Sequence, residues 1–423
     1  MEIIGDIILW TVYFISLYFS IFMILVFLEK QKKLKEEVSS TKTPHEPKVT
    51  IIVPAYNEET TIFKTLESIR DIDYPKKKLE AIIINDGSSD NTEKEIKKFI
   101  KKNKLNNFKL ISHSNIGKGA SMNKALKIAK GEFFTCLDAD SFVHPKTLKK
   151  MLAFYYREND PQLAIVTPAM KVYNPKNILQ RVQWIEYIIM IFVGRLTSQL
   201  DSLYVAPGPF SLYQTEIIRN VGGFDEKVLT EDQEIAYRMQ ENHYRIKQCF
   251  DGYVYTVSPD KLVPFYKQRR RWYLGSLSCA YKYKKLIANK KYGDFGLIQM
   301  IKNVLGYFLA IAGMAFAFYF IILPIFLKIK NGWIISFDFI PFLKDLNFIF
   351  DPLFLDIPKI TIFGVLLLTS AFFFYHAHKN ANEKMRAFGY IPIIPYFAFY
   401  YLLKGSILIL TLYEFARGKK IKW

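Results

Sequence analysis

The segments Val-Thr-Ile-Ile-Val-Pro-Ala-Tyr-Asn-Glu at residues 49–58 and Ala-Ile-Ile-Ile-Asn-Asp-Gly-Ser at residues 81–88 decide the fold of this chain. Each begins as a run of β-branched residues and ends in polar residues, which is typical of a buried strand. A third run covers residues 132–137, and helical spacing marks residues 59–70, 92–102 and 121–129. This alternation of strands and helices predicts an open α/β sheet.

Polar residues follow the predicted strands, at the sheet edge where ligands of open α/β sheets bind. Asp86 comes directly after an apolar run, so its carboxylate can accept hydrogen bonds from a nucleobase or a ribose. Asp138 and Asp140 are expected to share one face of an extended segment. Two such carboxylates repel each other unless a cation joins them, and hard oxygen ligands suit Mg²⁺ or Mn²⁺. The alternative is a solvated turn.

Two more segments carry groups suited to phosphate. The loop at residues 117–124 opens a helix and holds Lys118 where it could meet a phosphate, although an ordinary surface loop has the same composition. Gln-Arg-Arg-Arg-Trp at residues 268–272 offers three guanidinium groups to diphosphate oxygens and an indole to a sugar ring. A basic and aromatic belt at a membrane interface is the alternative.

Thr-Glu-Asp-Gln-Glu at residues 230–234 is predicted to open a helix. Thr230 is expected to cap this helix, with Glu231 and Asp232 in its first turn. Capping alone would explain these three residues, so their chemistry depends on what lies opposite them.

The composition indicates a membrane protein, because 51% of the residues are hydrophobic and 16% are aromatic. Residues 1–28 are predicted to form a transmembrane helix that is retained, since no cationic segment or cleavage site accompanies it. The lysines that follow place the N-terminus outside and the next part of the chain in the cytoplasm. Residues 29–48 are predicted to be a linker.

The second half of the chain contains several more apolar stretches. Residues 177–200 and 265–291 are predicted to be interfacial helices, and residues 304–327 and 357–376 to be transmembrane helices. Residues 390–413 could either span the membrane or form a re-entrant or interfacial segment, because Pro392, Pro395 and Lys404 interrupt them. Residues 414–423 form a basic tail.

The net charge of +19 suits a surface that rests against anionic lipid and attracts an anionic ligand. Nucleic acid is not expected as a partner, because the basic residues are spread along the chain and lie beside membrane segments. The three cysteines, Cys136, Cys249 and Cys279, have no metal-ligand spacing and are expected to be small core residues.

Six motifs occur in one order between residues 49 and 275, and together they are specific. They are Val-Pro-Ala-Tyr-Asn-Glu (53–58), Asn-Asp-Gly-Ser (85–88), Asp-Ala-Asp (138–140), Gly-Gly-Phe-Asp (222–225), Thr-Glu-Asp (230–232) and Gln-x-x-Arg-Trp (268–272). In this series the chain resembles the processive family 2 glycosyltransferases, which include cellulose, hyaluronan, chitin and poly-N-acetylglucosamine synthases. The resemblance implies a Rossmann-like GT-A domain at residues 49–265, a UDP-sugar donor and inversion at the anomeric carbon.

The resemblance also assigns roles to individual residues. Asp232 matches the general base, and Asp140, with Asp138, matches the metal-binding pair for Mg²⁺ or Mn²⁺. The donor-binding positions are Tyr56, Glu58, Asp86, Lys118, Asp138, Gln268 and Arg271. The acceptor-binding positions are Trp272, Glu231 and, in the segment Pro207–Ser211, Gly208 and Pro209. Thr-Glu-Asp in place of Gly-Asp-Asp favours the cellulose and poly-N-acetylglucosamine branches over hyaluronan synthases.

The function implied is that of a multi-pass plasma-membrane enzyme whose cytoplasmic domain builds an extracellular polysaccharide, with N-acetylglucosamine or glucose as the sugar. One alternative is a non-processive transferase that charges a polyprenyl phosphate or a glycolipid with one sugar. Another is a membrane channel or scaffold with a degenerate transferase domain. The second is disfavoured because every expected catalytic position is filled.

Overall fold

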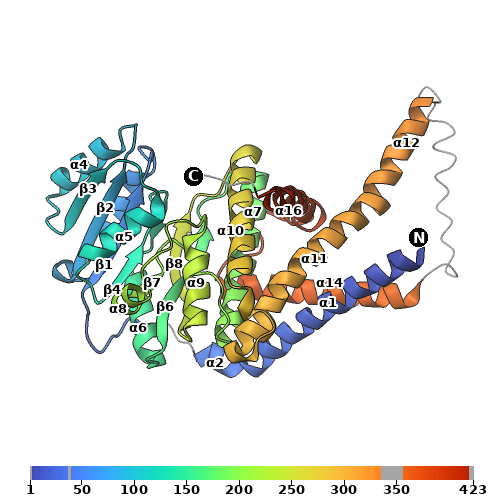
Figure 1. Cartoon of the computed structure of the whole chain (residues 1–423), viewed down its shortest axis with the longest axis horizontal. Helices are drawn as coiled ribbons and strands as arrows, with labels where there is room; N and C mark the ends of the chain where they lie inside the picture. The colour runs from blue at the N-terminus through green and yellow to red at the C-terminus, as the bar shows by residue number, and fades with distance from the viewer. Residues whose placement is uncertain (1, 37–39, 335–355, 419–423) are drawn as a thin grey trace.

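The computed structural model describes residues 2–36, 40–334 and 356–418, with the sheet domain at one end and long apolar helices at the other (Figure 1). One eight-stranded sheet has the strand order β3-β2-β1-β4-β7-β6-β8-β5. The strands are β1 (Val49–Ala55), β2 (Leu79–Asp86), β3 (Phe108–His113), β4 (Phe133–Cys136), β5 (Ser141–Val143), β6 (Leu163–Val172), β7 (Leu212–Gln214) and β8 (Arg245–Thr256).

The first half of the sheet is parallel, as the sequence predicts. Strands β3, β2, β1 and β4 pair in parallel, whereas β7 and β5 run antiparallel to their neighbours. The carboxyl ends of β1, β2 and β4 therefore meet at one edge. The three predicted strands and the open α/β sheet are confirmed, and the structure adds five strands, of which β5 and β7 run antiparallel to their neighbours.

Helices cover both faces of the sheet. Ile51 and Val53 of β1 pack into the core beneath α3 (Ile62–Arg70), α4 (Thr92–Asn103) and α6 (Thr147–Glu158). Ile52 points to the opposite core, beneath α5 (Lys118–Ile128), α8 (Thr215–Asn220) and α9 (Glu231–Glu241). Because β1 is buried on both faces, its sequence is a continuous apolar run rather than an alternating one. The three cysteines are buried and free, as expected.

Two long helices, α7 (Ile178–Gln199) and α10 (Leu262–Lys282), lie between the sheet and the apolar helices (Figure 1). The apolar helices are α1 (Glu2–Glu29), α11 (Met300–Ala317), α12 (Leu323–Ile334), α14 (Ile357–Asn380) and α16 (Tyr401–Ala416), with the single turn α15 (Ile393–Pro395) before the last. Part of the predicted linker is helical, because α2 (Gln31–Glu36) follows α1 and buries Leu34.

Among the described residues, four helical stretches are long and apolar enough to cross a membrane. They are Gly5–Glu29, Phe295–Lys330, Ile357–Asn380 and Ile393–Ala416. In Figure 1, α1 and α14 run side by side across the picture, whereas α16 is seen nearly along its axis. Helix α16 is therefore not parallel to α1 and α14. The part of the basic tail beyond Gly418 lies outside the described residues.

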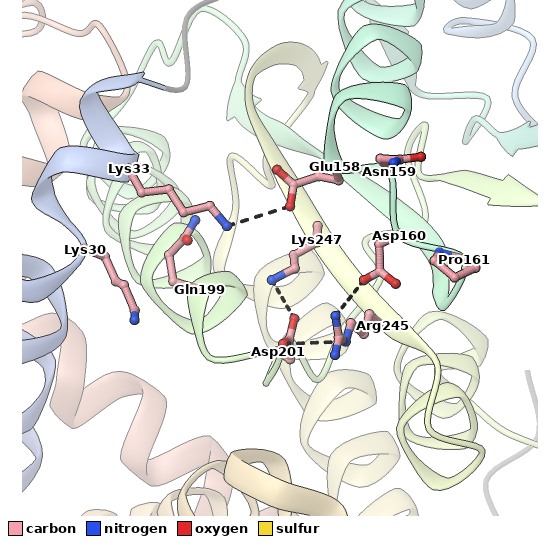
Figure 2. A pocket seen from close by; sticks show the side chains of 10 residues that line it. All are labelled: Lys30, Lys33, Glu158, Asn159, Asp160, Pro161, Gln199, Asp201, Arg245 and Lys247. Atoms are coloured by element: carbon pink, nitrogen blue, oxygen red, sulfur yellow. Dashed lines mark hydrogen bonds and ion pairs between the residues drawn. The ribbon is translucent and has the colours of Figure 1, made fainter.

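A polar pocket of about 430 Å³ lies between the end of α1 and the sheet domain (Figure 2). It lies at the start of β6 and β8, at the edge opposite the ends of β1 and β2. The Nζ of Lys247 lies 2.5 Å from Asp201, and Arg245 lies 2.8 Å from Asp160. Because Lys33, Arg245 and Lys247 are paired with carboxylates of the same pocket, we interpret this pocket as a structural joint.

Candidate active site

Lys118 joins two of the carboxylates that the sequence singles out. The Nζ of Lys118, at the first residue of α5, lies 2.7 Å from Asp138 and 2.7 Å from Glu231. Burial disfavours the charged ammonium, but the two carboxylates outweigh burial and raise the pKa of Lys118. Lys118 therefore holds the end of β4 against the start of α9.

The other strand-end carboxylates carry less compensating charge. Burial raises the pKa of Asp140, and the negative charge of Asp138 adds to this effect. Burial also raises the pKa of Glu58, with contributions from Asp140 and Asp138. Three carboxylates thus influence one another at this edge, which favours a proton or a cation between them.

A divalent cation fits the pair Asp138 and Asp140 only with help from a ligand. No group of three or more His, Cys, Asp and Glu side chains in the described part of the chain is arranged to hold a metal ion. Mg²⁺ commonly binds through one or two carboxylates together with substrate phosphates and waters. The two aspartates therefore fit the protein half of such a site.

Asp86 organises the loop that precedes Lys118. Its carboxylate accepts hydrogen bonds from the backbone N–H groups of Ile116 at 2.8 Å and Gly117 at 3.0 Å. The Nδ1 of His113 also lies 3.4 Å from this carboxylate, which has about four acceptor positions, so at least one remains for a ligand. Tyr56, after β1, is 50% exposed and leaves its ring accessible to a ligand.

Asp232 lies in the first turn of α9, where its oxygen accepts the backbone N–H of Gln233 at 2.8 Å. Burial raises the pKa of Asp232 to about 6, and the neighbouring charge of Glu231 adds to the increase. The positive charges of Lys118 and Arg271 act in the opposite direction. Asp232 therefore has a proton affinity suited to a general base near neutral pH.

Thr230 occupies the N-cap position of α9, as predicted, but its side chain does not cap the helix. Its hydroxyl makes no capping hydrogen bond and lies 4.0 Å from the Sγ of Cys279 on α10. The reason is close packing between α9 and α10, since Gly275 of α10 lies directly against the side chain of Thr230. The residue before Glu231 and Asp232 is thus used for helix contact.

Gly275→Ala should therefore destabilise the protein by about 1–3 kcal/mol. The added Cβ would lie 2.2 Å from the Oγ1 of Thr230, which is too close without movement of α9. The measurement is the thermal unfolding of the purified protein. Gly306→Ala in α11 is the matched control, because nothing lies within 4 Å of its added Cβ. Equal unfolding temperatures for the two variants would contradict the close contact.

Only one of the three guanidinium groups in the Gln-Arg-Arg-Arg-Trp segment is directed to the site. Arg269 binds Glu186 of α7 at 2.6 Å, and Arg270 binds Glu414 of α16 at 2.7 Å. Arg271 acts on Asp232, whose pKa its charge lowers. The expectation that all three arginines serve a diphosphate is therefore corrected, because Arg269 attaches α10 to α7 and Arg270 attaches it to α16.

Gln268 and Trp272 flank these arginines on α10. The Oε1 of Gln268 is buried without a hydrogen-bond partner in the described structure, so it can still accept a hydrogen bond from a ligand. The ring of Trp272 lies under Arg269, with 4.1 Å between the guanidinium carbon and the ring centroid. This contact fixes the indole, which is partly exposed.

The predicted acceptor loop closes over the end of β4. A Cβ added to Gly208 would lie 3.4 Å from both the Asp138 carboxylate and the Lys118 ammonium. The next residue, Pro209, is buried, and the backbone N–H of Phe210 donates to the carbonyl of Cys136 at 2.5 Å. Phe210 has φ 65°, a left-handed conformation that no local pattern predicted.

Comparison with known proteins agrees with this geometry. The glycosyl transferase family 2 profile matches residues 50–222. A poly-beta-1,6-N-acetyl-D-glucosamine synthase of Staphylococcus epidermidis is 27% identical over 413 residues, which cover 96% of this chain and 93% of that protein. The same synthase of Staphylococcus aureus (strain COL) is 34% identical over 229 residues, 54% of each chain.

A solved structure has the same fold. The mannosyltransferase of Pyrobaculum calidifontis, in complex with GDP-Man and Mn²⁺, superposes with a TM-score of 0.60 at 18% identity and covers 97% of this chain and 99% of its own. It supports the GT-A fold. The profile match covers the strands whose ends hold Asp86, Asp138 and Asp140. Residues 50–222 therefore form a glycosyl transferase family 2 domain, and the chain as a whole is similar to processive members of that family.

Proposed function

We propose that this chain is a membrane-embedded, inverting β-glycosyltransferase that polymerises a sugar from a UDP-sugar into an extracellular polysaccharide. The observation that carries the proposal is the convergence of Asp138, Lys118, Glu231 and Asp232 at one sheet edge. The similarity to poly-N-acetylglucosamine synthases over 96% of the chain makes UDP-N-acetylglucosamine the first donor to test.

In this proposal, the donor lies along the ends of β1 and β2. Tyr56 and the free acceptor positions of Asp86 and Glu58 would hold the uridine. Lys118, Arg271 and Gln268 would hold the diphosphate, since ammonium and guanidinium groups form charge-assisted hydrogen bonds with phosphate oxygens. A bound Mg²⁺ or Mn²⁺, held by Asp140 and Asp138, would stabilise negative charge on the diphosphate.

The acceptor approaches from the side of α9 and α10. Asp232 would accept the proton of the acceptor hydroxyl as its oxygen attacks the anomeric carbon, and the diphosphate would leave with its bonding electron pair. Trp272 offers a flat surface to the terminal sugar, next to Gly208, Pro209 and Glu231. Lys118 and Arg271 lie where they can stabilise the departing charge.

The membrane arrangement is part of the same proposal. We infer that Gly5–Glu29, Phe295–Lys330 and Ile357–Asn380 span a plasma membrane with the sheet domain in the cytoplasm. Helix α16 differs in direction from α1 and α14, which favours the interfacial alternative for residues 390–413. The charge of Lys404 no longer argues against burial, because its Nζ lies 2.5 Å from Glu186.

A non-processive transferase that charges a polyprenyl phosphate or a glycolipid remains the second candidate. The decisive experiment uses purified protein in lipid nanodiscs with a panel of UDP-sugars, with Mg²⁺ or Mn²⁺ and with a chelator. Metal-dependent UDP release with a high-mass, glycosidase-sensitive product supports the polysaccharide synthase. A lipid carrying a single sugar as the only product would replace it with the second candidate.

The activity should fall as the pH drops through about 6. Asp232 must be ionised to accept a proton, and its raised pKa of about 6 means that it becomes protonated there. The ratio kcat/KM should then fall roughly tenfold per pH unit on the acid side. Glu231→Gln removes a neighbouring negative charge and should move this acid limb to lower pH. A flat profile down to about pH 5 would contradict the role of Asp232.

A further inference from the structure

Helix α9 carries a buried carboxylate that the reaction itself does not use. Glu234 has 0% of its surface exposed, although it lies only two residues beyond Asp232. A buried carboxylate is rare in proteins unless its charge is paired and its oxygens are hydrogen-bonded. What surrounds Glu234 therefore indicates why it is there.

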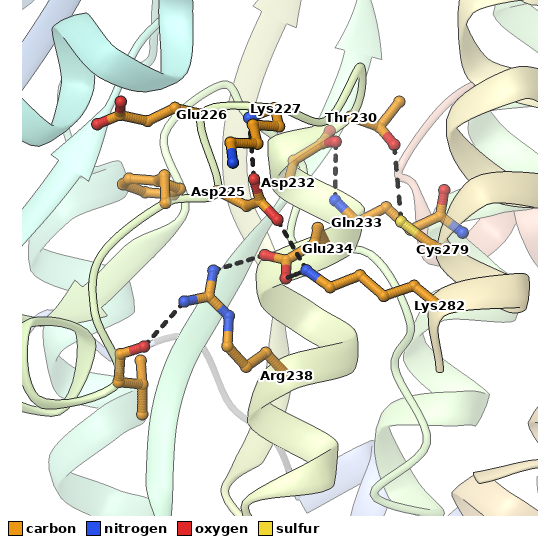
Figure 3. Close-up of polar contacts among 12 residues, drawn as sticks. Asp225, Glu226, Lys227, Thr230, Asp232, Gln233, Glu234, Arg238, Cys279 and Lys282 are labelled. Atoms are coloured by element: carbon orange, nitrogen blue, oxygen red, sulfur yellow. Dashed lines mark hydrogen bonds and ion pairs between the residues drawn. The ribbon is translucent and has the colours of Figure 1, made fainter. Parts of the chain in front are cut away.

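Three hydrogen-bond donors converge on Glu234, and two of them, Lys282 and Arg238, are drawn in Figure 3. One oxygen accepts from the Nζ of Lys282 at 2.7 Å and from the hydroxyl of Tyr283 at 2.6 Å. The other oxygen accepts from Arg238 at 2.5 Å. Lys282 ends α10 and Tyr283 directly follows it, whereas Arg238 belongs to α9 itself. One side chain thus ties the two helices together.

The same cluster reaches the loop that leads into α9. Lys282 also binds Asp225 at 2.7 Å, and Asp225 ends the Gly-Gly-Phe-Asp motif. Arg238 donates to the carbonyl of Val221 at 2.9 Å. The loop that leads into α9 is therefore held at Val221 and at Asp225 by the two cations that bind Glu234.

Further contacts align α9 with α10 on either side of Glu234. Gln233 donates to the Oγ of Ser276 at 3.2 Å, and Thr230 packs on Gly275. Because α10 also carries Arg271 and Trp272, its position relative to α9 sets the distance between the base and the groups that hold the donor and the acceptor. A small shift of α9 along α10 would move Asp232 without moving Arg271.

We propose that Glu234 is a positioning residue that fixes Asp232 on α9 relative to Arg271 and Trp272 on α10. This inference rests on the proposed function, in which Asp232 is the general base. Glu234 touches neither donor nor acceptor. It acts by holding α9 in register, so its loss should impair transfer to the acceptor more than binding of the donor.

Glu234→Gln tests this role in the full-length enzyme in nanodiscs with UDP-N-acetylglucosamine. The amide places an N–H group opposite side chains that must donate a hydrogen bond, so the contact between α9 and α10 should weaken. We expect kcat to fall at least about tenfold while KM for the donor stays within about threefold. A larger share of the cleaved donor should end as free N-acetylglucosamine rather than polymer, because water replaces a poorly aligned hydroxyl.

Glu80→Gln is the matched control. Glu80 is also buried, and it accepts from Lys109 at 2.8 Å and from Thr50 at 3.0 Å at the opposite edge of the sheet. It should change thermal stability without changing kcat per folded molecule or the polymer share. If Glu234→Gln behaves like Glu80→Gln, Glu234 is only structural and the proposal is overturned.

Two further measurements keep the result decisive. Tyr283→Phe removes one hydrogen bond to Glu234 but leaves the ion pairs with Lys282 and Arg238 intact, so it should lower kcat to a smaller extent. It replaces Glu234→Gln in the test if that variant does not fold. Hydrogen exchange over residues 225–241 and 270–283 can be measured without any sugar donor. Faster exchange of both segments in Glu234→Gln or Tyr283→Phe would support the link between α9 and α10 through Glu234. This holds even if the wild type uses no UDP-sugar, a result that would contradict only the proposed function. Unchanged exchange in both variants would overturn the proposed role of Glu234 in holding α9 against α10.

Discussion

Asp232→Asn should reduce sugar transfer by about 10³-fold while UDP binding stays near that of the wild type. The amide keeps the size and the hydrogen bond to Gln233 but cannot accept the acceptor proton. The effect should therefore appear in kcat rather than in donor affinity. The measurements are single-turnover transfer from UDP-N-acetylglucosamine and calorimetric titration with UDP.

Asp160→Asn provides the control for the general effect of losing an aspartate. Asp160 pairs with Arg245 at 2.8 Å in the pocket at the other edge of the sheet. Its replacement should leave kcat unchanged and should lower the stability of the protein only slightly. Transfer by Asp232→Asn within tenfold of the wild-type rate would exclude Asp232 as the base. Loss of UDP binding in the same variant would instead indicate a misfolded site.

Removal of divalent cations should reduce activity by about 100-fold or more, and Asp140→Asn should have a similar effect. A metal bound to the diphosphate supplies several kcal/mol of charge stabilisation, and about 3 kcal/mol is roughly 100-fold in rate. Burial and the negative charge of Asp138 raise the pKa of Asp140, so a cation bound between the two carboxylates would relieve an existing repulsion. Asn keeps one oxygen ligand but removes the charge.

Binding can be measured apart from catalysis by the electron paramagnetic resonance of Mn²⁺ with UDP present. Wild-type protein should bind Mn²⁺ in this titration, and Asp140→Asn should bind it much more weakly. Asp73→Asn is the control, because Asp73 pairs with Lys149 outside the site. Full activity in chelator, together with Mn²⁺ binding unaffected by Asp140→Asn, would refute the metal site.

The strand ends could be predicted from the sequence because they depend on local patterns. A β-branched run followed by Asp86 or by Asp138 gives both the strand and the edge at which its carboxylate lies. The later strands were missed for a local reason too. Pro168 interrupts β6 at a register shift, and Asp251-Gly252 within β8 reads as a turn. Pairing of β6 with β8 overrides both signals.

The candidate site could be located from the sequence, but its internal connections could not. The sequence placed Lys118 beside phosphate, whereas the structure pairs it with Asp138 and Glu231. Glu234 lies in the motif that the sequence singled out, yet only as one more acid at a helix start. Its partners, Lys282 and Tyr283, are nearly fifty residues further along the chain.

The sequence by itself therefore determined the family, the parallel half of the sheet and the residues at its carboxyl edge, because backbone preference and apolar burial act over a few residues. Only the tertiary structure decided which charges meet. Arg269 and Lys404 both bind Glu186, which lies 83 and 218 residues away from them. An ion pair depends on distance in space, and no local pattern encodes that distance.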